Sequence, residues 1–383
     1  MEKIDLTRRG FLQATGGALL AAPFVEATAA AQVPQLAVPP APGKKLGYAL
    51  VGLGNLSIFQ LLPAFGKAEK SKLTAFVSGR PEKAKQLAAR YGVLDKNIYN
   101  YDNFDSIANN PDIDIVYIVL PNSMHAEYTV RALKAGKHVL CEKPMATTPQ
   151  ECEQMIAAAK AANRKLQIGY RLHFEPNNLA MIKMARDQEF GPTRLILADA
   201  GFNIGLVMGS GTEKQWRLVK KMAGGGSLMD IGIYALNATR YLSGEEPVEV
   251  NAIIHTTPND PRFTEVEENI AFQLRFPSGI LANCTSSYGV GVNRWRVVGT
   301  KGAFELEPAL SYSGLRMRVL RNGAVEERLN PVKDHFATEM DALSECVMNN
   351  TESLAPGEEG LKDLKIMMAI YESARSGKPV KLT

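Results

Sequence analysis

The chain has 383 residues, and 44 Lys and Arg against 40 Asp and Glu leave a formal net charge of only +4. This mild charge, without a cluster of basic residues interleaved with aromatic ones, argues against a nucleic-acid-binding protein. The four cysteines, at positions 141, 152, 284 and 346, include no C-x-x-C pair, so the sequence predicts no metal site and demands no disulfide.

The first 31 residues have the pattern of an export signal. Arg8 and Arg9 precede a weakly apolar run from Phe11 to Phe24, and small residues follow in "EATAAAQ". Paired arginines before Gly-Phe-Leu favour the twin-arginine type, and the run is too short for a permanent membrane span. We therefore expect a periplasmic protein without membrane attachment after export. The alternative is a chance basic pair before a buried helix.

Residues 32–45 predict an extended arm. The stretch "QVPQLAVPPAPGKK" contains four prolines, which favour an extended chain over a packed element. The arm is either a flexible linker or a segment that lies across a neighbouring subunit. About 350 residues follow the signal, enough for two domains.

Residues 46–168 predict a Rossmann dinucleotide-binding domain. A buried strand over 46–51 leads into the turn Gly52-Leu-Gly54-Asn-Leu-Ser57 and then a helix. Gly52 allows the tight turn, and Gly54 lets the backbone approach a pyrophosphate at the helix N-terminus. Strands and helices then alternate as far as residue 168, which is typical of a doubly wound parallel sheet.

The end of the second predicted strand favours NADP over NAD. Ser78, Arg80 and Lys83 follow this strand, and no acid stands where NAD enzymes place one for the ribose. A hydroxyl, a guanidinium and an ammonium suit a 2′-phosphate. Alternatively, Arg80 and Lys83 are only solvated charges on the first turn of the next helix.

Lys143 follows the strand "KHVLCE" and is stiffened by Pro144. In such a sheet, ligands bind beyond the carboxyl ends of the strands, where Gly52, Ser78, Pro121 and Asn122 are also expected. A fixed ammonium there can stabilise a developing phenolate or alkoxide. The alternative is a lysine that marks the return of the chain to solvent.

Residues 169–383 predict a second, α+β domain. Several runs alternate apolar and polar residues, as in an antiparallel sheet with one covered face, and helices over 225–244, 334–350 and 359–377 are expected to cover it. The uncovered face would serve as a surface for a dimer.

Asp230 and Tyr234 stand at i and i+4 after three glycines, so they share one helix face. We expect Gly224–Gly226 to let the backbone approach the nicotinamide end of the cofactor. A phenol next to the Lys143 ammonium becomes a better proton acceptor, and Asp230 would orient a sugar hydroxyl. The alternative makes Tyr234 a core aromatic residue and Asp230 a helix N-cap.

The chain resembles the glucose-fructose oxidoreductase and inositol dehydrogenase (Gfo/Idh/MocA) family. The resemblance rests on "VGLG", "SGRPEKAK", "LPNSMHAE", "CEKPMATT", "IGYR", "PGEEG" and the glycine-rich block with its flanks. It implies a Rossmann domain, an open-faced sheet domain, tightly held NADP covered by the arm, and a homodimer or homotetramer. The family's catalytic residues fall on Lys143, Asp230 and Tyr234. Its cofactor contacts fall on Gly52, Gly54, Ser78, Lys83, Pro121, Asn122, Glu142, Lys143, Arg171, Trp216 and Arg217.

Many family members carry His where this chain has Tyr234, and the tyrosine favours the branch that transfers hydride between sugars. Residues 201–217 and 315–330 depart from the family pattern, which leaves the choice of sugar open. The expected activity is oxidation of an aldose at C1 to a lactone, with the hydride passed through bound NADP to a second sugar carbonyl. Two alternatives are an exported glycosidase of the same fold and a non-catalytic NADP-binding sugar sensor.

Overall fold

The computed structural model of the protein describes residues 43–206 and 215–382. The predicted export signal over 1–31 and residues 32–42 of the predicted arm lie outside the described residues. Residues 207–214, within the segment that departs from the family pattern, also lie outside them.

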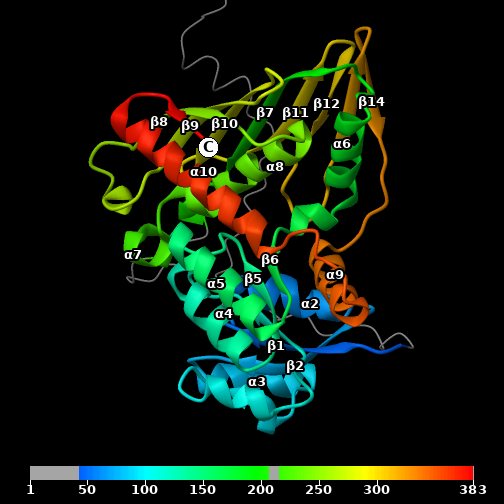
Figure 1. Ribbon diagram of the computed structural model, residues 1–383, viewed down its shortest axis with the longest axis vertical. Helices are drawn as coiled ribbons and strands as arrows, with labels where there is room; N and C mark the ends of the chain where they lie inside the picture. The colour runs from blue at the N-terminus through cyan, green and yellow to red at the C-terminus, as the bar shows by residue number, and fades with distance from the viewer. Residues whose placement is uncertain (1–42, 207–214, 383) are drawn as a thin grey trace, which may run out of the picture. The chain divides into compact units, whose positions relative to one another are not determined.

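The first sheet is fully parallel and has six strands in the order β3-β2-β1-β4-β5-β6. Its strands are β1 (Leu46–Val51), β2 (Ser71–Val77), β3 (Ile98–Tyr99), β4 (Ile115–Ile118), β5 (His138–Glu142) and β6 (Leu166–Gly169). The helices associated with it are α2 (Leu62–Phe65), α3 (Pro81–Tyr91), α4 (His125–Lys134) and α5 (Pro149–Ala162). Figure 1 shows α3, α4 and α5 beside these strands.

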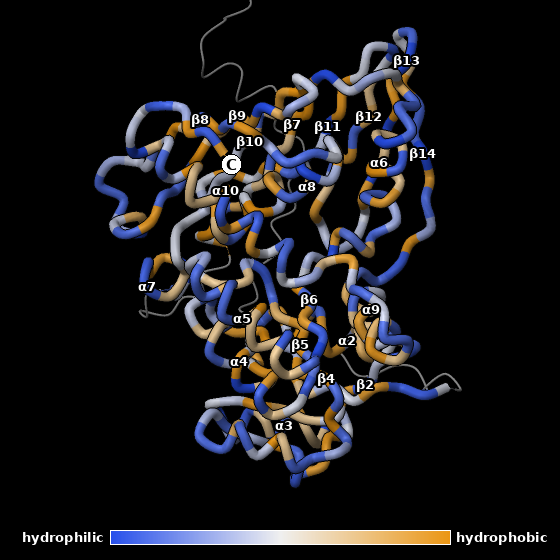
Figure 2. The backbone as a smooth tube through the Cα atoms, viewed as in Figure 1, coloured by the Kyte–Doolittle hydropathy of each residue, from blue (hydrophilic) through white to orange (hydrophobic). Residues whose placement is uncertain are grey.

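Local sequence explains these elements well. Every residue of β1 is buried, as expected for a strand covered on both faces, and the central parallel strands are orange in Figure 2. Helix α5 begins with a capping box, in which Thr148 accepts from the Glu151 amide and Glu151 reaches back. It ends at Asn163 in the left-handed conformation, with φ of 50°.

The second sheet has nine strands in the order β14-β13-β12-β11-β7-β10-β9-β8-β15. All neighbouring pairs are antiparallel except β7 with β10. Its strands are β7 (Thr193–Gly201), β8 (Glu249–His255), β9 (Asn269–Arg275), β10 (Leu281–Ser287), β11 (Val292–Gly299), β12 (Gly302–Leu306), β13 (Met317–Arg321), β14 (Ala324–Arg328) and β15 (Val380–Lys381). The predicted fold class, a Rossmann domain joined to an α+β domain with a large, mostly antiparallel sheet, is confirmed.

Helices cover one face of the nine-stranded sheet, and Figure 1 shows α6, α8 and α10 against it. Along β9, buried positions alternate with exposed or half-buried ones, so the other face stays open. The remaining helices are α6 (Pro176–Arg186), α7 (Lys220–Ala223), α8 (Ile233–Ser243), α9 (His335–Asn349) and α10 (Gly357–Ser376). The helix predicted over 225–244 is shorter than expected, because a π-helical turn over Leu228–Gly232 precedes α8.

A buried ionic cluster ties α8 to α10. The Arg240 guanidinium, 3% exposed, lies 2.6 Å from the fully buried Asp363 carboxylate and 2.9 Å from Glu359. Asn237 donates to the other Asp363 oxygen at 2.8 Å. Asp363 therefore bonds to two positions of α8 that lie within two turns of Tyr234.

Asp363→Ala is expected to lower the free energy of unfolding by about 3 kcal/mol, because it leaves a buried guanidinium and a buried amide with fewer partners. Urea denaturation of the purified protein measures the change. Lys362→Ala is the matched control: Lys362 pairs with Glu359 but is 48% exposed, so its loss should cost below about 1 kcal/mol. Equal effects of the two substitutions would contradict a stabilising role for the buried cluster.

Candidate active site

The turn after β1 has the shape of a dinucleotide-binding turn. Gly52 has φ of +91°, and a Cβ there would lie 2.2 Å from the Val119 carbonyl oxygen, so only glycine fits. The Ser57 hydroxyl donates to the Gly52 carbonyl at 2.6 Å and closes the turn. At Gly54, no atom lies within 4 Å of a Cβ position, which leaves the space that a pyrophosphate against this backbone requires.

The end of β2 places Ser78, Arg80 and Lys83 at the first turn of α3. Ser78 is buried, and its hydroxyl accepts from the Arg80 amide at 3.1 Å. Burial, and then the neighbouring Arg80 charge, lower the pKa of Lys83. Within residues 43–206 and 215–382 the acid of this turn, Glu82, pairs with Lys85 at 3.7 Å, and neither Arg80 nor Lys83 forms an ion pair, so no carboxylate neutralises their charges there.

The ends of β4 and β5 are joined by His125, which the sequence analysis missed. Its two ring nitrogens lie 2.8 Å from the Pro144 carbonyl and 2.9 Å from the Leu120 carbonyl. Asn122 donates to the Ala223 carbonyl at 2.8 Å and links this strand end to the glycine-rich block. Pro121 precedes it as the N-cap of the short helix Asn122–Met124. These bonds fix the backbone from which Lys143 projects.

Lys143 meets the residues of the second domain that were predicted to act with it. Its ammonium lies 4.7 Å from the centroid of the Tyr234 ring and 3.5 Å from Asp230 Oδ1, and it donates to the Asp230 carbonyl at 2.5 Å. Burial disfavours the positive charge of Lys143 and would lower its pKa. The electrostatic effect of Tyr234, Asp230 and Glu142 favours the charge and is larger than the effect of burial. The pKa of Lys143 is therefore raised, and the side chain is held as a cation.

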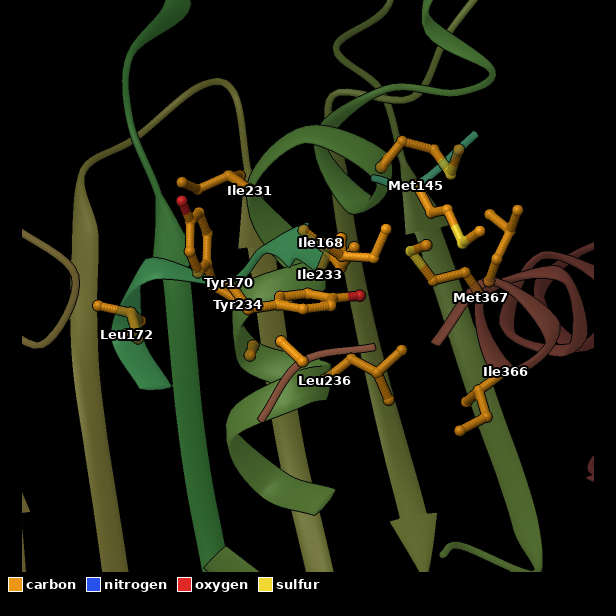
Figure 3. Close-up of a cluster of buried hydrophobic side chains, with 14 of the residues drawn as sticks. Met145, Ile168, Tyr170, Leu172, Ile231, Ile233, Tyr234, Leu236, Ile366 and Met367 are labelled. Carbon is orange, nitrogen blue, oxygen red and sulfur yellow. The ribbon is translucent and has the colours of Figure 1, made fainter. Parts of the chain in front are cut away.

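Tyr234, at the start of α8, has two cations close to its ring. The guanidinium carbon of Arg171 is 5.2 Å from its ring centroid, on the same ring that Lys143 approaches. Figure 3 shows Tyr234 with Ile233 and Leu236 in the buried cluster that also includes Tyr170. The ring also borders a small cavity of about 20 Å³, which is lined in part by His173. Packing therefore fixes this phenol, which keeps 8% of its surface exposed.

Asp230 does not cap a helix. Its Oδ2 accepts from Arg217 Nε at 2.9 Å and from the Tyr288 hydroxyl at 3.0 Å. Burial alone would raise the pKa of Asp230, but Arg217, Lys143 and the Tyr288 hydrogen bond together lower it. Asp230 is therefore ionised, and Arg217, which the family resemblance assigns to the cofactor, contacts this carboxylate.

Arg171 and Glu142 belong to a second buried group beside Tyr234. Arg171 donates to the Leu310 carbonyl at 2.5 Å and contacts His335 Nδ1 at 3.0 Å. Glu142 accepts from the Tyr117 hydroxyl at 2.8 Å, and Glu339 lies 3.4 Å from the same hydroxyl. Burial raises the pKa of Glu142, and burial together with the nearby Glu142 charge raises the pKa of Glu339.

Trp216 and the glycine-rich block complete the site. The Arg217 guanidinium lies 4.5 Å from the Trp216 ring, directly after the residues outside the described range. Glu267 accepts from the Gly226 amide at 2.8 Å and from the Leu228 amide at 2.9 Å. A Cβ at Gly226 would lie 2.1 Å from the Glu267 carbonyl oxygen. Close packing on Glu267 is thus one reason for this glycine, and the expected approach of the glycine-rich backbone to the cofactor stays a prediction.

Residues 43–206 and 215–382 contain no group of three or more His, Cys, Asp or Glu side chains that could hold a metal ion. Over the same ranges, no helix combines the length and apolar character that a membrane span requires.

A Rossmann turn with room for a pyrophosphate, and a lysine fixed against a tyrosine and an aspartate beyond the strand ends, define a nicotinamide-dependent oxidoreductase. The family comparison agrees. Residues 46–170 match the Gfo/Idh/MocA model described as "Oxidoreductase family, NAD-binding Rossmann fold", and residues 206–382 match the model of its "C-terminal alpha/beta domain". The chain belongs to the Gfo/Idh/MocA oxidoreductase family, which confirms the resemblance seen in the sequence.

Known relatives cover nearly all of the chain after the predicted signal. The crystal structure of aldose-aldose oxidoreductase from Caulobacter crescentus, complexed with glycerol, is 52% identical, with a TM-score of 0.85 over 88% of this chain and 100% of that chain. D-xylose 1-dehydrogenase [NADP(+)] from Haloarcula marismortui is 32% identical over 350 residues, 88% of this chain and 92% of that protein. 1,5-anhydro-D-fructose reductase from Ensifer adhaerens is 25% identical over 340 residues, 88% of this chain and 98% of that protein.

Proposed function

We propose that the protein is a periplasmic, NADP-dependent sugar oxidoreductase that oxidises an aldose at C1 to a lactone and passes the hydride to the carbonyl of a second sugar. The observation that carries the proposal is the Lys143 ammonium 4.7 Å from the centroid of the Tyr234 ring and 3.5 Å from the Asp230 carboxylate. The similarity to an aldose-aldose oxidoreductase and to an NADP-dependent xylose dehydrogenase supports sugars as substrates.

The unpaired cations at the end of β2 support NADP. Arg80 and Lys83 form no ion pair within the described ranges, where Glu82 pairs with Lys85 instead, and the Ser78 hydroxyl, which accepts from the Arg80 amide, still has its hydrogen to donate. This set matches the 2′-phosphate that distinguishes NADP from NAD. Held by the turn at Gly54 and by Ser78, Arg80 and Lys83, NADP would supply the acceptor for the hydride of C1 and, once reduced, the hydride donor for the second sugar.

In this mechanism Tyr234, as a phenolate, accepts the proton of the C1 hydroxyl while the C1–H bond breaks. Lys143 stabilises the phenolate through its fixed positive charge, which it holds before the reaction begins. Asp230 accepts a hydrogen bond from a neighbouring sugar hydroxyl and orients the ring. In the second half, Tyr234 returns the same proton to the oxygen of the acceptor carbonyl, so protons and electrons balance over the cycle.

The proposed location and assembly rest on different features. The twin-arginine pattern at Arg8 and Arg9 supports export of a folded, cofactor-loaded protein. A cofactor that is reduced and reoxidised in place suits a compartment without free nicotinamide nucleotides. Ile253 and Leu281, 71% and 50% exposed, lie on the open face of the large sheet and support a homodimer or homotetramer built through that face. Sugars, and neither nucleic acid nor membranes, are the proposed partners.

Purification of the exported protein tests the proposal directly. We expect nucleotide to co-purify with the protein, and one aldose among those added singly to produce the absorbance of reduced nicotinamide without added cofactor. A second sugar should then remove this absorbance, with lactone and a reduced sugar formed in equal amounts. Turnover only with added free NADP would contradict the transfer between sugars. Release of an aglycone from a glycoside would favour the glycosidase, and a bound nucleotide that no sugar reduces would favour the sensor.

A further inference from the structure

The Asp230 carboxylate is held mainly through one of its two oxygens. Oδ2 accepts two hydrogen bonds, from Arg217 Nε at 2.9 Å and from the Tyr288 hydroxyl at 3.0 Å. Among the described residues, Oδ1 has only the longer ion-pair contact with Lys143, at 3.5 Å. The two donors on Oδ2 therefore turn Oδ1 toward Lys143, which leaves this oxygen able to accept a hydrogen bond from a substrate hydroxyl.

A small apolar cluster fixes both donors. This cluster, separate from the main core, consists of Ile204, Leu218, Phe263, Val266 and Tyr288. Tyr288 is fully buried, and the Phe202 ring packs edge-on against it at 5.4 Å. Leu218 directly follows Arg217, so the same cluster anchors the segment that carries the guanidinium.

The backbone of Tyr288 is fixed as well. Its amide donates to the Glu268 carbonyl at 2.9 Å, and its carbonyl accepts from the Ile204 amide at 2.9 Å. A phenol locked in this way cannot turn to another acceptor without loss of packing. The cluster thus holds a hydrogen-bond donor at a constant position against Asp230.

We propose that Tyr288 is a positioning residue for the sugar reaction: with Arg217 it orients Asp230 so that Oδ1 accepts a hydroxyl of the aldose beside Lys143. This inference rests on the proposed function and adds a residue to it that neither the glycine-rich motif nor the family resemblance identified. Tyr288 acts only through Asp230. Loss of the Tyr288 hydroxyl should therefore change the orientation and the pKa of the Asp230 carboxylate without changing the binding of the nucleotide.

The charges around Asp230 determine how the loss of Tyr288 affects the pH dependence. Lys143 faces the carboxylate from the end of β5, and Arg217 faces it from the short helix Trp216–Leu218. Tyr288, the residue directly after β10, donates to it. Tyr234 lies one turn after Asp230 in the same segment of the chain. The Tyr288 hydrogen bond is one of the contributions that lower the pKa of Asp230. Its removal raises this pKa, so loss of activity on acidification should begin at a higher pH.

The test compares Tyr288→Phe with the nucleotide-loaded wild type. We expect kcat/KM for the aldose to fall about tenfold and its acid limb to move to higher pH, with unchanged nucleotide content. In an Asp230→Asn background, Tyr288→Phe should not lower kcat/KM further, because the carboxylate through which Tyr288 acts is already absent. Tyr48→Phe is the matched control: Tyr48 is equally buried, but its hydroxyl donates to the Met340 carbonyl in the Rossmann core.

Two results separate this inference from the proposed function. If the wild type transfers hydride and Tyr288→Phe has the rate and the pH profile of Tyr48→Phe, the positioning role is wrong. If no sugar is oxidised by the wild type, the proposed function is wrong, and the Asp230–Tyr288 contact is tested without turnover. Carboxyl ¹³C NMR, assigned with Asp230→Asn, should then show the titration of Asp230 at higher pH in Tyr288→Phe. An unchanged titration midpoint overturns the inference.

Discussion

Tyr234→Phe is expected to lower kcat by about 10³-fold, because it removes the group that accepts the C1 hydroxyl proton. Phenylalanine keeps the ring that Lys143 and Arg171 approach, at 4.7 and 5.2 Å from the centroid. Packing and cofactor binding should therefore survive. Stopped-flow absorbance of the first half-reaction measures the change, with nucleotide content and melting temperature recorded on the same sample.

The control for this experiment lies on the same helix. Tyr241, two turns further along α8, packs against the His173 ring at 3.8 Å, and its hydroxyl is 3.5 Å from the Leu354 carbonyl. Tyr241→Phe keeps this ring contact and should leave kcat within about twofold of the wild type, because the Tyr241 hydroxyl interacts with the Leu354 carbonyl and with Glu359 and with none of the proposed catalytic groups. If Tyr234→Phe is as active as Tyr241→Phe, a proton-accepting role for Tyr234 is excluded, and the sensor or another proton acceptor has to be considered.

Features encoded over short distances in the sequence could be predicted. The Gly52 turn and the continuous apolar strands depend on neighbouring residues, and the structure contains both. The glycine-rich stretch and the Lys143 turn also stood out locally. The expectation that the glycine-rich stretch and Lys143 meet across the two domains rested on the family resemblance and on the rule that ligands bind beyond the strand ends.

Contacts between distant segments gave no such signal. Tyr288 reaches Asp230 from 58 residues away, and Glu339 reaches Tyr117 from 222 residues away. Each is a single polar residue at a strand end or within a helix, and the same pattern would suit a solvated or a purely structural position. Only the packing of the two sheets and α9 makes them neighbours of the site.

The sequence predicted close backbone contacts at the glycine-rich block but not all of the partners in these contacts. Three glycines before an apolar segment indicate close backbone contact, but the sequence cannot say with what. In the structure the contacts are the Glu267 backbone at Gly226 and the Tyr371 hydroxyl at Gly225. Tyr371 also donates to Glu267 at 2.8 Å. The glycines therefore seat the segment that carries Asp230 on a buried carboxylate.

Lys143→Met is expected to lower kcat by about 10²- to 10³-fold, because the phenolate of Tyr234 loses the fixed charge that stabilises it. The fold should tolerate the change. Asp230 keeps its bonds to Arg217 and Tyr288, at 2.9 and 3.0 Å, so no buried carboxylate is left without a partner. Methionine fills a similar volume beside the Tyr234 ring. Single-turnover kinetics with the bound nucleotide measure the loss.

Lys143→Arg separates charge from shape. It keeps the positive charge, but a planar guanidinium cannot reproduce an ammonium that is placed 2.5 Å from the Asp230 carbonyl and 3.5 Å from its carboxylate. We expect an intermediate rate, about tenfold above that of Lys143→Met, since the charge alone restores part of the stabilisation. Rates for Lys143→Met within twofold of the wild type, with nucleotide still bound, would show that the ammonium takes no part in the proton transfer. The placement of Lys143 beside Tyr234 would then serve only to join the two domains.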